Sequence, residues 1–169
     1  WHPFDLQAGR RDADGSIDHS VDDGKDEDYY EQAKENVRRL QEKYGVEMDL
    51  DIARDVDSLD AQIVSYHVKE NHEYDQWLAF DEALFDALWN DGRDIGDSDV
   101  LRDVADESGL DPTAVDTALD DDRLRADLYD LFDRARREGV TGVPTFAYDG
   151  YAARGAVPPE QLERLVEGV

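Results

Sequence analysis

Apolar residues recur at intervals of three and four along the chain between about residues 27 and 139. This spacing places them on one face of an α-helix, so the pattern predicts a series of amphipathic helices. The strongest example contains Trp77, Phe80, Leu84 and Leu88 and ends before Gly92. Further helices are predicted over 27–44, from an N-cap near Ser58, from a cap at Ser98 to Gly109, from Asp111–Pro112 through Leu119, and from about Leu124 to Gly139.

The two ends of the chain have a different pattern. Trp1–Leu6 is short, apolar and aromatic, which predicts a strand, and the polar segment 7–28 that follows predicts a solvated loop. Residues 144–148 and 151–154 predict two strands joined at Asp149–Gly150, a pair typical of tight hairpins. A last helix begins at Pro158–Pro159. A two-stranded ribbon is marginal by itself, so we expect Trp1–Leu6 and a strand upstream of residue 1 to complete the sheet.

Charge is the most unusual feature of the composition. The 169 residues carry 44 acidic and 18 basic side chains, for a formal net charge of −26. So many like charges destabilise a compact state at ordinary ionic strength, whereas in molar salt the Debye length falls to about 3 Å. The composition therefore favours a cytoplasmic protein of a halophilic cell. An acidic surface that mimics nucleic acid or attracts a basic partner is the other interpretation.

Several functional classes are disfavoured by what the sequence lacks. There is no basic stripe to neutralise phosphates, which argues against a nucleic-acid partner. No stretch approaches the ~20 apolar residues of a membrane span. Cysteine is absent, which excludes thiol catalysis and zinc–thiolate sites for the residues given. His67 and His72 lie about 140° apart on a helix, so no metal site is predicted.

The segment Gly142-Val143-Pro144-Thr145-Phe146 leads into the predicted hairpin and resembles the DsbA family of thioredoxin-fold proteins, particularly its FrnE-like branch. Five further segments are similar in the expected order: His2–Leu6, Glu82–Phe85, Asp91–Ile95, Ser108–Asp111 and Gly155–Pro158. The resemblance implies an α/β, thioredoxin-like fold with a helical domain inserted between the second strand and the cis-Pro loop. The thioredoxin-like parts are then 1–26 and 140–169, and the inserted helical domain is 27–139.

The resemblance also implies a function, that of a thiol–disulfide oxidoreductase acting on protein or small-molecule thiols and disulfides. Pro144 corresponds to the active-site cis-Pro, and Val143, Pro144, Thr145, His2 and Phe4 are the predicted substrate-binding residues. The family's Cys-x-x-Cys has no match here, so we expect it in a segment upstream of residue 1. No cofactor is predicted, and a homodimer stays open.

Two alternatives remain at this point. A glutathione-dependent isomerase, similar to the 2-hydroxychromene-2-carboxylate isomerases, would share this architecture and would have Ser or a lone Cys upstream, with glutathione as its cofactor. A non-catalytic module would instead use the Val143–Pro144 edge to capture extended peptides. The motif upstream of residue 1 would distinguish the three functional hypotheses, which are the oxidoreductase, the isomerase and the binding module.

Overall fold

The computed structural model describes the chain except residues 13–14, 22–23, 25, 49, 51–55 and 169. The chain divides into two compact units, one formed by Gln7–Arg125 and the other by Trp1–Leu6 together with Ala126–Val169. Compactness does not by itself identify an inserted domain. The bounds predicted for the insertion, 27–139, therefore stay a prediction, as do 1–26 and 140–169 for the thioredoxin-like parts.

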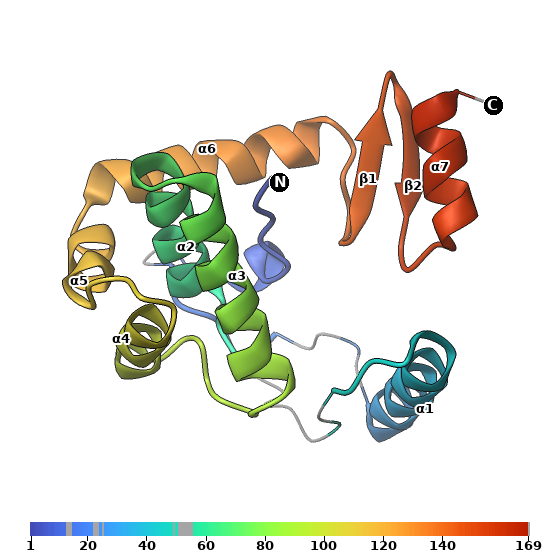
Figure 1. Cartoon of the computed structure of the whole chain (residues 1–169), viewed down its shortest axis with the longest axis horizontal. Helices are drawn as coiled ribbons and strands as arrows, with labels where there is room; N and C mark the ends of the chain where they lie inside the picture. Colours follow the sequence, from blue (N-terminus) through green and yellow to red (C-terminus); the bar gives the residue numbers. More distant parts are fainter. Residues whose placement is uncertain (13–14, 22–23, 25, 49, 51–55, 169) are drawn as a thin grey trace. The chain divides into compact units, whose positions relative to one another are not determined.

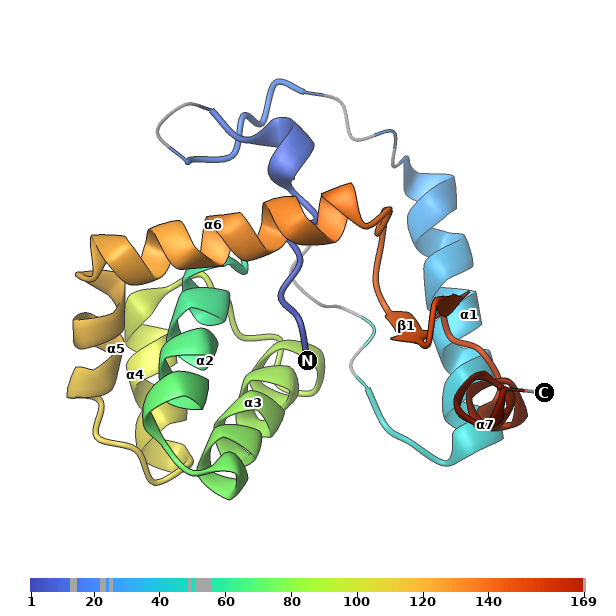
Figure 2. The same ribbon diagram turned by 90° about the horizontal axis from the view of Figure 1, so that it is seen from above.

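The larger unit is helical (Figures 1 and 2). Its elements are the short 3₁₀ helix η1 (Ala8–Arg10), α1 (Glu27–Tyr44), α2 (Leu59–Asn71), α3 (Tyr74–Trp89), α4 (Ser98–Glu107) and α5 (Thr113–Leu119), and α6 (Asp122–Arg137) begins in it. The bounds of α1 confirm the prediction. The Asp26 carboxylate accepts a hydrogen bond from the Tyr29 N–H at its start, and Gly45 ends it with a φ of 66°, which glycine adopts without steric cost. None of the described helices is both long and apolar enough to cross a bilayer.

The core of this unit lies where α2 packs against α3 and α5, and where α4 packs against the same two helices. Its fully buried side chains include Ile63, Val64, Val68, Phe80, Leu101, Val104 and Val115. Burial of each such side chain contributes roughly 1.5–3 kcal/mol. Trp77, Phe80 and Leu84 are also buried, which confirms the apolar face predicted for α3.

Hydrogen bonds of the buried Ser65 side chain connect α2 to α3. The Ser65 hydroxyl donates to Asp81 Oδ1 at 2.7 Å and accepts a hydrogen bond from Trp77 Nε1 at 3.1 Å. Ser65 is 2% exposed, so both bonds satisfy a group that water barely reaches. Burial raises the pKa of Asp81 above its ordinary value, and the bond from Ser65 only partly opposes this.

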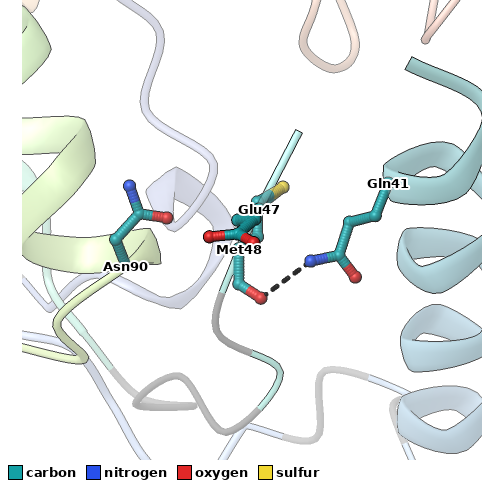
Figure 3. Close-up of a pocket in the computed structure, with 4 residues that line it drawn as sticks. All are labelled: Gln41, Glu47, Met48 and Asn90. Carbon is teal, nitrogen blue, oxygen red and sulfur yellow. Dashed lines mark hydrogen bonds between the residues drawn. The ribbon is translucent and has the colours of Figure 1, made fainter. Parts of the chain in front are cut away.

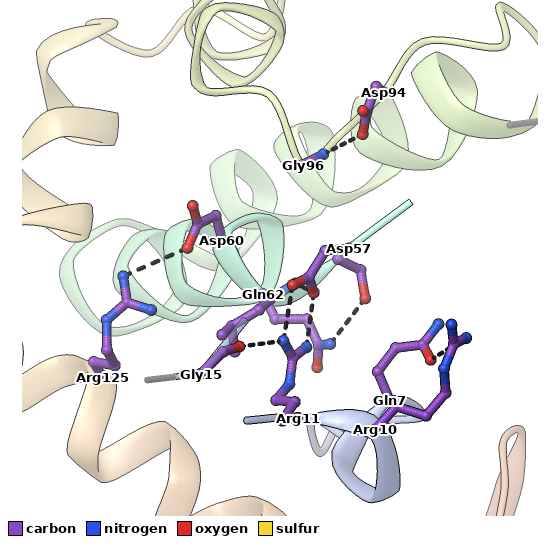
Figure 4. A network of polar contacts seen from close by, with 12 residues as sticks. Gln7, Arg10, Arg11, Gly15, Asp57, Asp60, Gln62, Asp94, Gly96 and Arg125 are labelled. Atoms are coloured by element: carbon purple, nitrogen blue, oxygen red, sulfur yellow. Dashed lines mark hydrogen bonds and ion pairs between the residues drawn. The ribbon is translucent and has the colours of Figure 1, made fainter. Parts of the chain in front are cut away.

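An ion pair joins the N-terminal segment of the unit to the start of α2 (Figure 4). Arg11 binds Asp57 in a two-pronged contact, with Nη2 2.7 Å from Oδ1 and Nη1 2.8 Å from Oδ2. Nη1 also donates to the Gly15 carbonyl at 2.8 Å. The Arg11 side chain is only 7% exposed, whereas that of Asp57 is 34% exposed. Arg11 is therefore fixed to the residue that precedes the N-cap of α2 by a largely buried guanidinium.

Of the two predicted serine caps, Ser58 occupies the N-cap position of α2 and Ser98 is wrong by one residue. The Ser58 side chain makes no capping hydrogen bond, and the Leu59 N–H instead donates to Asp57 Oδ1 at 3.0 Å. Ser98 is the first residue of α4, which is capped by Asp97, whose Oδ1 accepts from the Asp99 N–H at 2.8 Å. In both cases an aspartate precedes the serine, and a carboxylate forms the stronger, charge-assisted bond to backbone N–H groups.

The smaller unit contains the sheet. Strands β1 (Thr145–Tyr148) and β2 (Tyr151–Arg154) pair antiparallel, and α7 (Pro159–Glu167) packs against both. Asp149 and Gly150 form the turn with φ of 46° and 82°. These positive angles match the twist of a two-residue hairpin. The predicted hairpin and last helix are therefore confirmed.

The prediction of a strand at Trp1–Leu6 is wrong for the described structure. Trp1–Asp5 has no regular secondary structure, and Leu6 lies in a turn. A strand exists only through a ladder of hydrogen bonds to a neighbour, and among the described residues β1 and β2 pair only with each other. Pro3 also has no N–H to contribute to such a ladder.

Candidate active-site loop

Of the predicted site residues, Val143 and Pro144 lie in the loop between α6 and β1, and Thr145 is the first residue of β1. After Arg137 the chain leaves α6 through Gly139, whose φ is 83°. The N–H groups of Gly139 and Val140 donate to the carbonyls of Arg136 and Ala135, each at 3.0 Å. This left-handed C-terminus satisfies helix carbonyls that would otherwise lack partners and turns the chain toward the sheet.

Three hydrogen bonds hold this loop. Thr145 Oγ1 donates to the Gly142 carbonyl at 2.7 Å, the Gly155 N–H donates to the Pro144 carbonyl at 2.9 Å, and Arg154 Nη2 donates to the Gly139 carbonyl at 3.2 Å. The Val143–Pro144 peptide bond is cis. Both ends of the loop are therefore tied to the hairpin.

Val143 is the open position of the loop. Its side chain is 51% exposed. Within the part of the chain that the structure describes, neither its N–H nor its carbonyl forms a hydrogen bond. Because an extended peptide offers the same pair of groups, this residue can exchange strand-like hydrogen bonds with one.

His2 and Phe4 belong to the same compact unit as the loop. His2 Nδ1 lies 3.0 Å from the Pro3 carbonyl, and the Phe4 side chain is half-buried. No hydrogen bond or ion pair among the described residues connects either of them to Val143, Pro144 or Thr145. Their part in substrate binding stays a prediction.

The hairpin beside the loop presents aromatic side chains to solvent. Phe146, Tyr148 and Tyr151 are 39%, 52% and 68% exposed. The edge of β1 that faces away from β2 has no strand partner among the described residues. An unpaired edge with apolar side chains is a surface to which a further strand can be added.

Arg154 was not among the predicted site residues. Its Cα pairs with that of Thr145 across the hairpin, and its guanidinium reaches the Gly139 carbonyl, so it connects the beginning of the loop to its end. The signal that could have identified it is the Asp149–Gly150 turn. A two-residue turn at that position places residue 154 directly opposite residue 145.

A hollow of about 610 Å³ in the helical unit is lined by Gln41, Glu47, Met48 and Asn90 (Figure 3), and Gln41 Nε2 donates to the Met48 carbonyl at 2.9 Å. Among the described residues that line it, Glu47 is the one ionisable group, so they offer no acid–base pair. Among the described residues, no three His, Asp or Glu side chains gather as ligands for a metal ion.

Comparisons with known proteins agree with this geometry. A family model described as the DSBA-like thioredoxin domain matches residues 1–167. The uncharacterized protein YwbO of Bacillus subtilis (strain 168) is 25% identical over 170 residues, which cover 98% of this chain and 79% of that protein. The crystal structure of the probable DsbA oxidoreductase SCO1869 from Streptomyces coelicolor is similar with a TM-score of 0.77 and 23% identity, over 99% of this chain and 73% of that one.

The structural likeness shows a DsbA-like thioredoxin fold, which confirms the predicted fold class. In the described residues this fold is mostly helical and has a small two-stranded sheet. The family match extends over nearly the whole chain. The chain therefore belongs to the DsbA-like thioredoxin domain family.

Proposed function

We propose that this chain is the greater part of a thiol–disulfide oxidoreductase of the FrnE-like branch, whose redox cysteines lie in a segment upstream of Trp1. The observation that carries the proposal is the open backbone of Val143 beside Pro144, in a chain of the DsbA-like family. The upstream segment would supply a thiolate that attacks a disulfide and a second cysteine that resolves the mixed intermediate. A helix N-terminus would lower the pKa of the attacking thiol.

The hairpin is consistent with a site whose peptide-binding residues lie in this chain and whose cysteines lie in the proposed upstream segment. The free edge of β1 offers a place for a strand of the upstream segment, which would bury Phe146 and complete a larger sheet. Val143, Pro144 and Thr145 would then form the wall opposite the reactive sulfur. In a reducing cytoplasm such an enzyme would reduce or isomerise disulfides rather than install them.

The first experiment is to express the complete gene, measure the intact mass of the protein and titrate its thiols in denaturant after reduction. We expect a mass several kilodaltons above the 19.2 kDa of this chain, with two thiols, and turnover of a glutathione mixed disulfide. A mass equal to that of this chain with no thiol would overturn the redox proposal.

A second candidate is a non-catalytic peptide-binding module. It is favoured by one observation, which is that none of the 169 residues is a cysteine. The module would bind extended peptides at Val143 with an affinity that reductant leaves unchanged, whereas the oxidoreductase would release a disulfide-trapped peptide on reduction. The two candidates therefore differ in their response to dithiothreitol.

A further inference from the structure

The charge around the loop is opposite in sign to that of the protein. Between Arg134 and Pro158 the chain has four arginines and two acids, whereas the whole chain has 44 acids and 18 bases. The acids in this stretch are Glu138 and Asp149. The stretch of chain that contains Val143 is therefore richer in arginines than in acids, in a chain whose net charge is −26.

Two of the four arginines are available to a ligand. Arg134 is paired with Glu138 at 3.0 Å, and Arg136 is paired with Asp133. Arg137 is exposed and makes no hydrogen bond or ion pair with the described residues. Arg154 is exposed as well and uses Nη2 on the Gly139 carbonyl, so its other donors remain available.

These two arginines lie at the two ends of the loop. Arg137 is the last residue of α6, two positions before Gly139, whose carbonyl Arg154 binds. Arg154 also pairs with Thr145, which directly follows Pro144. Arg137 therefore stands where the chain enters the loop that contains Val143, and Arg154 stands opposite the residue where the chain leaves it.

We propose that Arg137 and Arg154 form a subsite for carboxylates, so that the loop selects peptide segments that carry acidic side chains next to the reacting sulfur. The proposal rests on the proposed function for its location. Guanidinium groups bind carboxylates through two parallel hydrogen bonds. An acidic segment would be repelled by a uniformly acidic protein, and the local positive charge removes that repulsion at the loop.

Stabilisation of a helix end would explain the position of Arg137 but not that of Arg154. Cations in the last turn of a helix interact favourably with its dipole, which accounts for Arg137. Arg154 lies on a strand, where this explanation does not apply. Arg164 occupies the last turn of α7 and is exposed. It therefore serves as a matched control for Arg137, because the reversal of either residue changes the net charge by two and alters a helix dipole interaction.

The test measures binding without any redox step. The probe is a blocked peptide with a central S-methylcysteine flanked by two glutamates on each side, and its comparison has glutamines in those positions. Titration by NMR or calorimetry in 0.1 M KCl, with folding checked by circular dichroism, gives both dissociation constants. S-methylglutathione, titrated in parallel, distinguishes a small thiol from an acidic protein segment as the source of the carboxylates.

We expect the glutamate peptide to bind about tenfold more tightly than the glutamine peptide, the sum of two exposed charge contacts. R137E and R154E should each reduce this preference and together abolish it. R154K, which keeps the charge but not the two parallel hydrogen bonds, should keep only part of it. R164E, compared with R137E, should leave the preference intact. The subsite would be overturned if the two peptides bound equally or if neither bound. It would also be overturned if R164E lost as much of the preference for the glutamate peptide as R137E does. Since no thiol is involved, these results are independent of the thiol titration that tests the redox proposal.

Discussion

The Arg11–Asp57 ion pair allows a quantitative test of how the helical unit is held together. The perturbation is Arg11→Met, which keeps most of the side-chain volume and removes the guanidinium. The control is Arg125→Met, because Arg125 pairs with Asp60 in the first turn of the same helix, α2, at 3.4 Å and acts on Asp57 only through a weaker charge attraction (Figure 4). The two pairs differ in burial, since Arg11 is 7% exposed and Arg125 is 33% exposed.

The magnitude follows from this difference. Removing one partner of a fully buried ion pair costs about 3–5 kcal/mol, because the remaining charge stays buried. Asp57 is 34% exposed, so water recovers part of that cost. Its bond from the Leu59 N–H also remains. We expect R11M to lower the free energy of unfolding by about 2–3 kcal/mol, and R125M by less than about 1 kcal/mol, as for exposed pairs.

The assay is urea unfolding followed by circular dichroism in 1 M KCl, where exposed charges are screened and the buried pair is not. Burial acts to raise the pKa of Asp57, but the hydrogen bonds from Arg11 and the Leu59 N–H, together with the positive charges of Arg11 and Arg125, outweigh it, so the pKa lies below the ordinary value of 3.8. The stabilisation is therefore complete well above pH 3.8 and is lost as the pH falls through the lower folded-state pKa.

The cost of R11M should consequently be largest at pH 7 and should shrink between about pH 4 and pH 2. An R11M protein within about 0.5 kcal/mol of R125M at pH 7 would refute the argument from burial. A cost that grows on acidification would refute the assignment of the effect to the ionised Asp57 carboxylate.

Three further predictions concern the loop, a close backbone contact and the net charge. Thr145→Val removes the 2.7 Å hydrogen bond to the Gly142 carbonyl. It should weaken peptide binding, measured by calorimetry, about two- to tenfold, which corresponds to the loss of one hydrogen bond. Thr145→Ser keeps the hydroxyl and should bind the peptide as the wild type does. Gly96→Ala would place a Cβ 2.8 Å from the Asp57 carbonyl oxygen and should cost about 1–3 kcal/mol in urea unfolding, whereas Gly9→Ala, with open space around it, should cost under about 0.5 kcal/mol. With a net charge of −26, the melting temperature should rise steadily as KCl increases from 0.1 M toward molar concentrations, and a melting temperature independent of KCl would contradict the halophilic interpretation.

The helices were predictable because their determinants are local. The spacing of Trp77, Phe80 and Leu84 defines a buried face within a single helix, and Gly45 ends α1 through its own backbone freedom. The Trp1–Leu6 strand was predicted wrongly because a strand depends on a neighbour, and its apolar pattern does not identify one. Ser58 occupies the N-cap position as predicted and Ser98 does not, but in both places the aspartate one residue earlier, and not the serine, accepts the hydrogen bond from the backbone N–H.

The residues of the candidate site also fall into those that the sequence could identify and those that needed the structure. Val143, Pro144 and Thr145 are consecutive, so one motif was sufficient to select them. Arg154 required the hairpin register. Arg11 and Asp57 are 46 residues apart, and nothing in a chain with so many aspartates indicates which one faces a given arginine. Residues that act through distant partners therefore needed the three-dimensional structure.

A site of this kind separates recognition from chemistry. Recognition of an extended peptide uses backbone groups and charges, which Val143, Arg137 and Arg154 offer within one compact unit. The chemistry requires sulfur atoms, and this chain has no cysteine. If the proposed function holds, peptide affinity belongs to the part of the protein described here, and the upstream thiols determine the rate of exchange. Replacement of those thiols by serine should then abolish turnover while leaving the dissociation constant of the S-methylcysteine peptide within about twofold, a change below roughly 0.4 kcal/mol. A much larger loss of affinity would show that the upstream segment takes part in recognition as well.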